Sequence, residues 1–330
     1  MTSRTIEGHD RTTNHCGGSH DSAFAVTDAQ RRALAEKLRR HAAAAGRPVR
    51  SFLRRPYPTA FPSTARLRRW RHRGHARLAH GRTFWGDRLR VRLPDEISIA
   101  IRRHGFIEYE LSAFLLRHLR TGATFLDVGA HLGYFTVLAA RCVGGSGRVV
   151  SFEPTPGTYA LLAQNVAGLG NVTAVPAAVW SSPGKVSLTD HGVGYSPYNS
   201  AYRSRLPAAV RQRVATTVHE VAAVALDEFV AARALTPDVV KIDAESAEKN
   251  VLEGMGRLLG TVRPVVSLEV GDLDVPGAPR SAELVEFMVG HDYRAYELSD
   301  GMPRPHRPRS SYEYDNLVFV AAEKGHLLDV

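Results

Sequence analysis

A glycine-containing turn is the first feature of this sequence that suggests chemistry. Asp127 closes an apolar run, and the letters DVGAHLG place Gly129 and Gly133 just before a helical pattern. Glycines at a strand-to-helix turn let the backbone approach a ligand, and the amide groups of the helix start face that ligand. We expect a nucleotide-like ligand here, with tight strand-helix packing as the alternative. The spacing is not the GxGxxG of dinucleotide-binding proteins, which argues against a dehydrogenase.

A second candidate is Glu153, which ends the next apolar run, VVSFEP, 26 residues after Asp127. A carboxylate at this place accepts hydrogen bonds from both hydroxyls of a ribose. We therefore predict that Glu153 binds the ligand, rather than being a solvated strand end. Trp180 follows a third apolar run, and either covers an adenine ring or belongs to the core.

Three more carboxylates follow two further apolar runs. Asp243 and Glu245 lie two residues apart in KIDAES, so their side chains share a face if the strand continues. Glu269 ends PVVSLEV, and clefts in open α/β sheets form at the carboxyl ends of the strands. Such carboxylates take a proton from a hydroxyl or orient an amine, so we predict a catalytic role for these three. Stabilisation of a helix start and binding of a divalent cation are the alternatives, and we expect no metal.

These residues need a parallel sheet to bring them together, and the apolar runs predict one. Runs typical of strands alternate with helical patterns, which indicates an α/β fold. The predicted strands are TFLDV (124–128), RVVSFEP, VTAVPAAV, KVSLT, a β-rich 213–226, DVVKID, PVVSLEV, and a terminal hairpin of YRAYEL and NLVFVAA. The predicted helices are 109–120, 134–142, 156–168, 246–255 and 281–289.

The N-terminal third has a different character. Residues 1–25 have almost no large aliphatic side chains, so we expect them to be disordered, with no metal site at His15, Cys16 and His20. Residues 26–105 form a predicted basic extension with a helix at 28–45 and a hairpin made of DRLRVRLPD and ISIAIRR. Residues 106–330 form the predicted catalytic domain.

Charge and composition limit the possible functions. The 330 residues are 44% hydrophobic and 23% charged, which is typical of a globular protein. No apolar run reaches the roughly 18 residues of a membrane span, so we expect no membrane partner. Two cysteines exclude a disulfide framework. The N-terminus lacks an apolar signal region, so we predict a cytoplasmic location.

The net charge of +10 is unevenly distributed. Residues 1–120 contain 25 Lys and Arg against 10 Asp and Glu, whereas 121–330 contain 18 against 23. Basic residues interleaved with Trp70 and Trp85 leave an RNA methyltransferase or RNA-binding module as the alternative function. We do not expect nucleic acid as the main partner, because the predicted catalytic part is mildly acidic.

Several motifs together resemble one family. DVGAHLGYFT, VVSFEPTP, VVKIDAESAEKNVLEGM, RPVVSLEV and NLVFV are similar, in order and spacing, to the FkbM-type S-adenosylmethionine-dependent methyltransferases over about 107–321. The resemblance implies a class I Rossmann-like fold, with a seven-stranded, mostly parallel sheet, helices on both faces and a final antiparallel strand. It also implies methyl transfer from S-adenosylmethionine to a hydroxyl or amine, leaving S-adenosylhomocysteine.

The resemblance also assigns site residues. It implies that the methionine part of the cofactor is bound by Asp127, Gly129, Ala130, Gly133 and Tyr134, and its ribose by Glu153. The other predicted cofactor-binding residues are His131, Pro154, Trp180 and Asp243. His131 replaces the usual Asn of the turn and is expected to donate a hydrogen bond. Ser246 replaces a usual Gly and is expected to cap the helix that begins at 247. The loop 191–203 has an Asn-Ser typical of the family and is interpreted as a lid.

The acceptor is expected to be a sugar. Acidic residues near the cleft favour a neutral or cationic acceptor over a phosphorylated one. The residues expected to create this charge are Asp243, Glu245, Glu269, Asp272 and Asp274. We therefore predict a glycoside or aminoglycoside of secondary metabolism, as in antibiotic biosynthesis, methylated at oxygen or nitrogen. A homodimer is left open.

Overall fold

The structure is a computed structural model that describes residues 26–45, 76–202, 212, 214–272 and 277–328. The predicted disordered segment 1–25 and residues 46–75 of the predicted basic extension therefore lie outside the described residues. The same applies to His15, Cys16, His20, Trp70 and Asp274.

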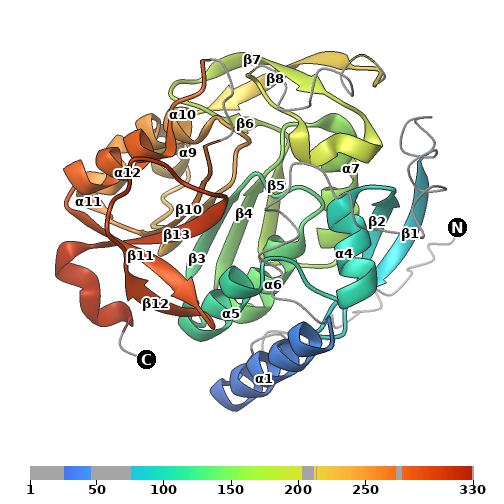
Figure 1. The fold of residues 1–330 in the computed structure, drawn as a ribbon, viewed down its shortest axis with the longest axis horizontal. Helices are drawn as coiled ribbons and strands as arrows, with labels where there is room; N and C mark the ends of the chain where they lie inside the picture. The colour runs from blue at the N-terminus through green and yellow to red at the C-terminus, as the bar shows by residue number, and fades with distance from the viewer. Residues whose placement is uncertain (1–25, 46–75, 203–211, 213, 273–276, 329–330) are drawn as a thin grey trace, which may run out of the picture.

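An eight-stranded sheet forms the centre of the molecule (Figure 1). Its strands are β3 (Thr124–Val128), β4 (Arg148–Phe152), β5 (Val172–Val175), β9 (Val239–Ile242), β10 (Val265–Val270), β11 (Tyr293–Ser299), β12 (Met302–Pro305) and β13 (Asp315–Ala321). They lie in the order β12-β11-β13-β10-β9-β3-β4-β5. The five strands from β10 to β5 are parallel, and β13 is antiparallel to both β10 and β11. The predicted class I sheet is confirmed, with β12 added at its edge.

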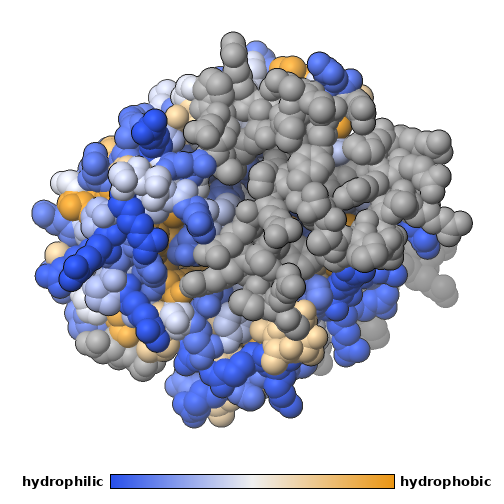
Figure 2. Space-filling view, in the orientation of Figure 1, coloured by the Kyte–Doolittle hydropathy of each residue, from blue (hydrophilic) through white to orange (hydrophobic). Residues whose placement is uncertain are grey.

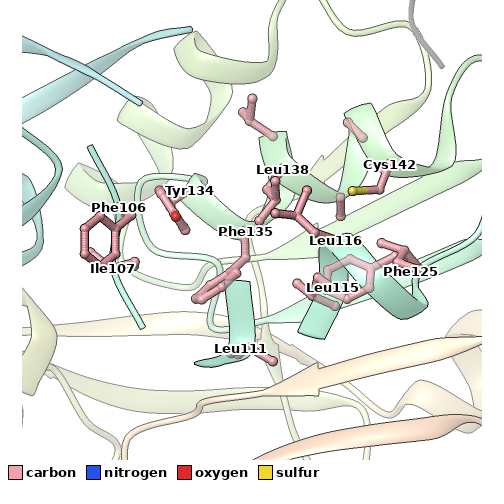
Figure 3. Packing of buried hydrophobic residues seen from close by; sticks show 14 of the residues in the cluster. Phe106, Ile107, Leu111, Leu115, Leu116, Phe125, Tyr134, Phe135, Leu138 and Cys142 are labelled. Carbon is pink, nitrogen blue, oxygen red and sulfur yellow. The ribbon is translucent and has the colours of Figure 1, made fainter. Parts of the chain in front are cut away.

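Helices cover both faces of this sheet. On one side lie α5 (Tyr109–His118), α6 (Tyr134–Val143) and α7 (Pro156–Val166), and on the other α9 (Leu226–Ala231), α10 (Glu248–Glu253), α11 (Gly256–Thr261) and α12 (Ser281–Gly290). Successive strand side chains point to opposite faces. Phe125 therefore belongs to the core cluster under α5 and α6, whereas Leu126 belongs to the cluster under α9–α12. In Figure 3, side chains of α5, α6 and β3 meet in the first cluster.

A small three-stranded sheet stands beside the carboxyl ends of the main strands. It consists of β6 (Ala178–Val179), β7 (Gly184–Asp190) and β8 (Thr217–Val224), and a 3-10 helix, η3 (Val193–Tyr198), follows β7. The expectation that VTAVPAAV is one strand is wrong, because β5 and β6 belong to different sheets. Pro176, between them, has no N–H to continue a ladder.

The N-terminal extension contains α1 (Asp28–Ala44), as predicted, and a hairpin of β1 (Arg77–Arg82) and β2 (Arg88–Leu93). The expectation that ISIAIRR is a strand is wrong, because it lies in the helix α4 (Glu96–His104). Asp95 caps this helix by accepting a hydrogen bond from the Ser98 amide at 2.7 Å. Ile97 and Ile101 are four residues apart, and this spacing places two side chains on the same face of a helix or of a strand. The apolar pattern alone therefore does not distinguish the two.

The described part of the extension packs onto the rest of the chain. Leu38 of α1, Phe84 and Ile101 belong to the same core cluster as α5 and α6. Arg31 is buried and donates to the carbonyls of Leu119, at 2.5 Å, and Cys142. Hydrophilic residues dominate the described part of the surface in Figure 2, and the chain closes with the 3-10 helix η4 (Ala322–Leu328). Within the described ranges no helix combines the length and apolar character needed to cross a membrane.

Candidate functional site

A pocket of about 760 Å³, counted up to its open mouth, lies at the carboxyl ends of β3, β4 and β9. This is the edge of the sheet where open α/β folds bind ligands. Several predicted site residues lie in its wall: Gly129, His131, Glu153, Pro154, Trp180, Asp243 and Glu245. The structure therefore brings together residues from three strand ends, as the sequence predicted.

The glycine turn brings two backbones into close contact. Gly129 has φ 74°, and a Cβ atom built on it would lie 1.7 Å from the carbonyl oxygen of Asp243. His131, which replaces the usual Asn, has φ 49°. Asn tolerates this left-handed conformation well, and His is also enriched there. The first departure from the family pattern thus keeps the backbone of the turn.

Glu153 is held by the backbone. It is 6% exposed; its Oε2 accepts from the His131 amide at 3.0 Å, and its Oε1 accepts from the Thr155 amide at 2.9 Å. Burial raises the pKa of the Glu153 carboxyl, and His131 and these hydrogen bonds oppose the rise. A carboxylate oxygen can accept more than one hydrogen bond, so both Glu153 oxygens can also accept from a ligand. The Glu153 carboxylate is therefore held in place in the pocket wall, and its binding to a ligand stays a prediction.

Lys241 connects the glycine turn to Asp243 through two hydrogen bonds. Its side chain is 2% exposed, and its Nζ donates to the Gly129 carbonyl at 3.0 Å and to Asp243 Oδ2 at 3.1 Å. The same Nζ lies 3.6 Å from Asp127 Oδ1. Burial lowers the pKa of Lys241, but Asp243, Asp127 and Glu108 outweigh it, so the pKa is raised. Lys241 is therefore paired with the carboxylates of Asp243 and Asp127.

Four of the predicted cofactor-binding residues do not line the pocket. Asp127 is fully buried and accepts from Thr136 Oγ1 at 2.6 Å, and the Tyr134 hydroxyl lies 3.0 Å from Ser112 Oγ. Ala130 and Gly133 are the remaining two, and Gly133 is the N-cap of α6. These residues shape the turn, and their contact with a cofactor stays a prediction.

The segment interpreted as a lid closes one side of the pocket. Ser200 Oγ donates to the Glu245 carbonyl at 2.6 Å, and the Asn199 amide lies 3.5 Å from Thr155 Oγ1. Ser196 Oγ donates to Asp95 Oδ2 at 2.7 Å.

His131 joins this contact, since its Nε2 lies 3.1 Å from Ser196 Oγ. These contacts join the lid, α4 and the glycine turn. Sequence reasoning missed Asp95 and Ser196, because the capping pattern at Asp95 gives no sign of a second partner about a hundred residues away.

Replacing Ser196 with Ala should loosen the lid. A hydrogen bond of this kind contributes about 0.5–1.5 kcal/mol, so the lid amides should exchange with deuterium about 2–10-fold faster. Mass spectrometry of peptides covering 193–200 measures this exchange. Ser187→Ala, on the small sheet, is the control and should leave the exchange of the lid unchanged. Equal exchange in both variants would contradict a latch at Ser196.

Trp180 is in the pocket wall and not in the core. Its side chain is partly exposed, and its ring lies 6.2 Å from that of Tyr202 with 29° between the planes. Of the two readings left open by the sequence, the structure favours the pocket. Contact of Trp180 with an adenine ring stays a prediction.

The expectation that Ser246 caps a helix is wrong. The helix α10 begins at Glu248, its N-cap is Ala247, and no side chain caps it. Glu248 reaches back instead, and its Oε1 accepts from the amides of Ala244 at 3.0 Å and Ser246 at 3.2 Å. Glu245 and Ser246 have φ of 51° and 81°. This left-handed backbone explains why glycine suits the Ser246 position.

A second group of carboxylates lies beside Asp243. Glu269 is 6% exposed near the end of β10, opposite Asn316 of β13, and Tyr314 hydrogen-bonds to it. The Asn316 amide donates to Glu108 Oε2 at 2.8 Å. Burial, and next the charge of Asp243, raise the pKa of Glu108 to about 7.

Sequence reasoning missed Glu108, whose partner is 208 residues away. Asp272, expected in the acidic pocket, accepts instead from the amides of Ser281 at 2.8 Å and Tyr312 at 2.9 Å. Among the residues that the structure describes, no group of three or more His, Cys, Asp or Glu is placed to hold a metal ion.

Solved structures with a similar chain path include the following three proteins, all of low sequence identity. The methyltransferase FkbM from Methylobacillus flagellatus KT is 14% identical, with 61% of this chain and 44% of that chain covered and a TM-score of 0.38. The chain thus spans less than half the length of that protein.

For fibrillarin from Aeropyrum pernix, the identity is 11%, the coverage 64% and 74%, and the TM-score 0.38. The O-methyltransferase from Bacillus cereus is 16% identical, with 64% and 78% covered and a TM-score of 0.35. No protein with a curated description matches the chain.

The family comparison is decisive. The model described as the methyltransferase FkbM domain matches residues 127–295, which is just over half of the chain. The matched region starts at the glycine turn and includes Glu153, the lid and the block around Asp243. The chain therefore belongs to the FkbM methyltransferase family.

Proposed function

We propose that this protein transfers a methyl group from S-adenosylmethionine to a hydroxyl or amine of a sugar or amino sugar. The observation that carries the proposal is the Glu153 carboxylate, fixed in the pocket wall by the His131 and Thr155 amides. Such an acceptor pair suits the two hydroxyls of a ribose.

The pocket residues fit the donor. Glu153 would hold the ribose, Trp180 would cover the adenine, and the turn at Gly129 and His131 would face the methionine part. The His131 Nδ1 is buried without a hydrogen-bond partner among the described residues, so it can bind a polar group of the donor. When bound, S-adenosylmethionine supplies a methyl group activated by the positive charge on its sulfur.

The acceptor side is acidic. Asp243 and Glu245 are in the pocket wall, and Glu269 ends the neighbouring strand. These charges favour a neutral or cationic sugar and disfavour a phosphorylated one. Holding the acceptor close and aligned contributes about 7–11 kcal/mol in favourable cases. We place this acceptor among the glycosides and aminoglycosides of secondary metabolism.

Replacing Glu153 with Gln should weaken binding of S-adenosylhomocysteine about 10–100-fold, because hydrogen bonds to a charged group contribute about 1.5–3 kcal/mol. Isothermal titration calorimetry of both proteins tests this. The control is Glu220→Gln, which removes an exposed carboxylate paired with Lys185 and should leave the affinity unchanged. Equal affinity of wild type and Glu153→Gln would remove Glu153 from the donor site.

The acceptor is tested with methyl-labelled S-adenosylmethionine. The probes are D-glucosamine, methyl α-D-glucopyranoside and neamine, and mass spectrometry locates the label on oxygen or nitrogen. Transfer to one of them supports a sugar acceptor. Transfer to none of them, by a protein that binds S-adenosylhomocysteine, would contradict it. Salt-sensitive transfer to a single-stranded RNA oligomer would favour the nucleic-acid alternative instead.

A further inference from the structure

We infer that Glu108 takes the proton of the acceptor group during methyl transfer. This inference rests on the proposed function and adds a residue outside the segment 127–295 that the family model matches. Four observations support it: the backbone at Glu108, the direction of its side chain, the polar atoms beside it and the charges around it.

The backbone at Glu108 is unusual. The residue is the N-cap of α5, with φ 40° and ψ 72°, but its side chain makes no capping hydrogen bond. A left-handed conformation costs roughly 1–2 kcal/mol for a residue other than glycine. Strained residues of this kind concentrate at functional sites. The Glu108 carboxylate is therefore not used to cap α5.

The side chain of Glu108 reaches the carboxyl edge of the sheet instead. Its Oε2 accepts from the Asn316 amide at 2.8 Å, and Asn316 is the register partner of Glu269. Leu268 is level with Ile242, which places Glu269 beside Asp243, a residue of the pocket wall. Glu108 therefore lies at the carboxyl edge of the sheet, beside Asn316 and close enough to Asp243 of the pocket wall to interact with its charge.

Asn316 provides a second sign of a ligand. The residue is 7% exposed, and its Oδ1 is buried without a hydrogen-bond partner among the described residues. A buried polar atom without a partner is costly, and such groups in native structures call for an explanation. A hydroxyl or ammonium group of the acceptor, bound beside Glu108, would donate to this oxygen.

The surrounding charges make Glu108 a better base than Asp243. Lys241 Nζ donates to Asp243 Oδ2 at 3.1 Å, so the Asp243 carboxylate already has a cationic partner. Glu108 hydrogen-bonds to a neutral amide, and burial and the charge of Asp243 raise its pKa to about 7. A base is most effective when its pKa is near the working pH. The ionisable groups around Glu108 are Asp127, Tyr134, Lys241, Asp243, Glu269 and Tyr314.

Methyl transfer to the acceptor group releases one proton, and Glu108 receives it. The acceptor oxygen or nitrogen forms a bond to the methyl carbon with its lone pair. The bond between that carbon and the donor sulfur breaks, and its electron pair stays on sulfur as a neutral thioether. The proton of the acceptor group passes to a carboxylate oxygen of Glu108. Asn316 and Glu269 orient the acceptor, and no further reactant is needed.

The first test is a titration that requires no turnover. Protein labelled with ¹³C at the glutamate carboxyls is titrated by NMR with S-adenosylhomocysteine bound, and Glu108→Gln identifies the Glu108 signal. We expect Glu108 to titrate near pH 7. In Asn316→Ser the midpoint should move higher, because the lost hydrogen bond stabilises the charged form. Titration near 4.5, the ordinary value for a Glu carboxyl, would overturn the inference.

The second test is methyl transfer to the amino sugar or glycoside probe that the wild type methylates. Wild-type kcat should rise with pH through a limb near 7. Glu108→Gln should lower kcat about a hundredfold or more and remove this limb, with KM for the acceptor little changed. The matched control is Glu110→Gln, two residues along the chain, where the side chain accepts from the Gly301 amide at 2.9 Å. It should stay within about threefold of wild type.

The two tests distinguish an error in the proposed function from an error in the role of Glu108. A wild type that methylates none of the probes contradicts the proposed function. A wild type that methylates a probe, beside a Glu108→Gln variant with unchanged kcat and the same pH limb, overturns only the role of Glu108. Circular dichroism and S-adenosylhomocysteine affinity show whether Glu108→Gln is folded with its donor site intact.

Discussion

Gly129→Ala should lose binding of S-adenosylhomocysteine and about 3 kcal/mol or more of unfolding free energy. The added Cβ atom would lie 1.7 Å from the Asp243 carbonyl oxygen and 2.9 Å from its carbonyl carbon. Both groups are backbone, so no rotamer change relieves the clash. The φ of 74° adds strain of roughly 1–3 kcal/mol for alanine. The central strands β3 and β9 would have to separate at their carboxyl ends.

Urea unfolding and calorimetric titration measure these two losses. Gly168→Ala is the matched control, because a Cβ atom there would meet nothing within 4 Å and its φ is not positive. We expect this control to stay within about 0.5 kcal/mol of wild type. If Gly129→Ala bound the cofactor product normally, the tight approach of Gly129 to Asp243 would not be a requirement of the site.

The central strands could be predicted from the sequence because they are buried on both faces. TFLDV and DVVKID are short segments rich in β-branched and other apolar residues, and turn or polar residues follow them at one edge of the sheet. This logic located Glu153 and Asp243 in the pocket. The prediction was wrong at ISIAIRR, because the spacing of its apolar residues fits a strand and a helix equally well. The cap at Asp95 decides between them, and it depends on geometry.

Contacts between distant segments could not be predicted. Ser196 meets Asp95 across 101 residues, and Asn316 meets Glu108 across 208. In both pairs each residue is of a common surface type, and nothing in its local pattern indicates a partner. Where the chain departs from the family, at His131 and Ser246, the structure shows left-handed backbone that the letters alone do not show.

Lys241 links the glycine turn to Asp127 and Asp243. Replacing it with Met should lower the unfolding free energy by about 3–5 kcal/mol at neutral pH. Removing one partner of a buried ion pair leaves the other charge uncompensated. Here two carboxylates lose their cation, because Lys241 Nζ lies 3.1 Å from Asp243 Oδ2 and 3.6 Å from Asp127 Oδ1. The turn also loses the donor to the Gly129 carbonyl. Met has a similar length, so packing changes little.

The deficit of Lys241→Met should depend on pH with a definite sign. Burial already raises the pKa of Asp127 and Lys241 opposes it, so the variant raises this pKa further. A carboxyl whose pKa is higher in the folded state binds more protons there, so stability falls as pH rises between the two pKa values. Urea unfolding should therefore show a smaller deficit at pH 5 than at pH 8. Adding Asp127→Asn should restore part of the loss. Lys185→Met, which breaks an exposed ion pair, should leave the unfolding free energy almost unchanged. A deficit equal at both pH values would mean that Lys241 stabilises the fold by packing, and not by balancing the carboxylates under the site.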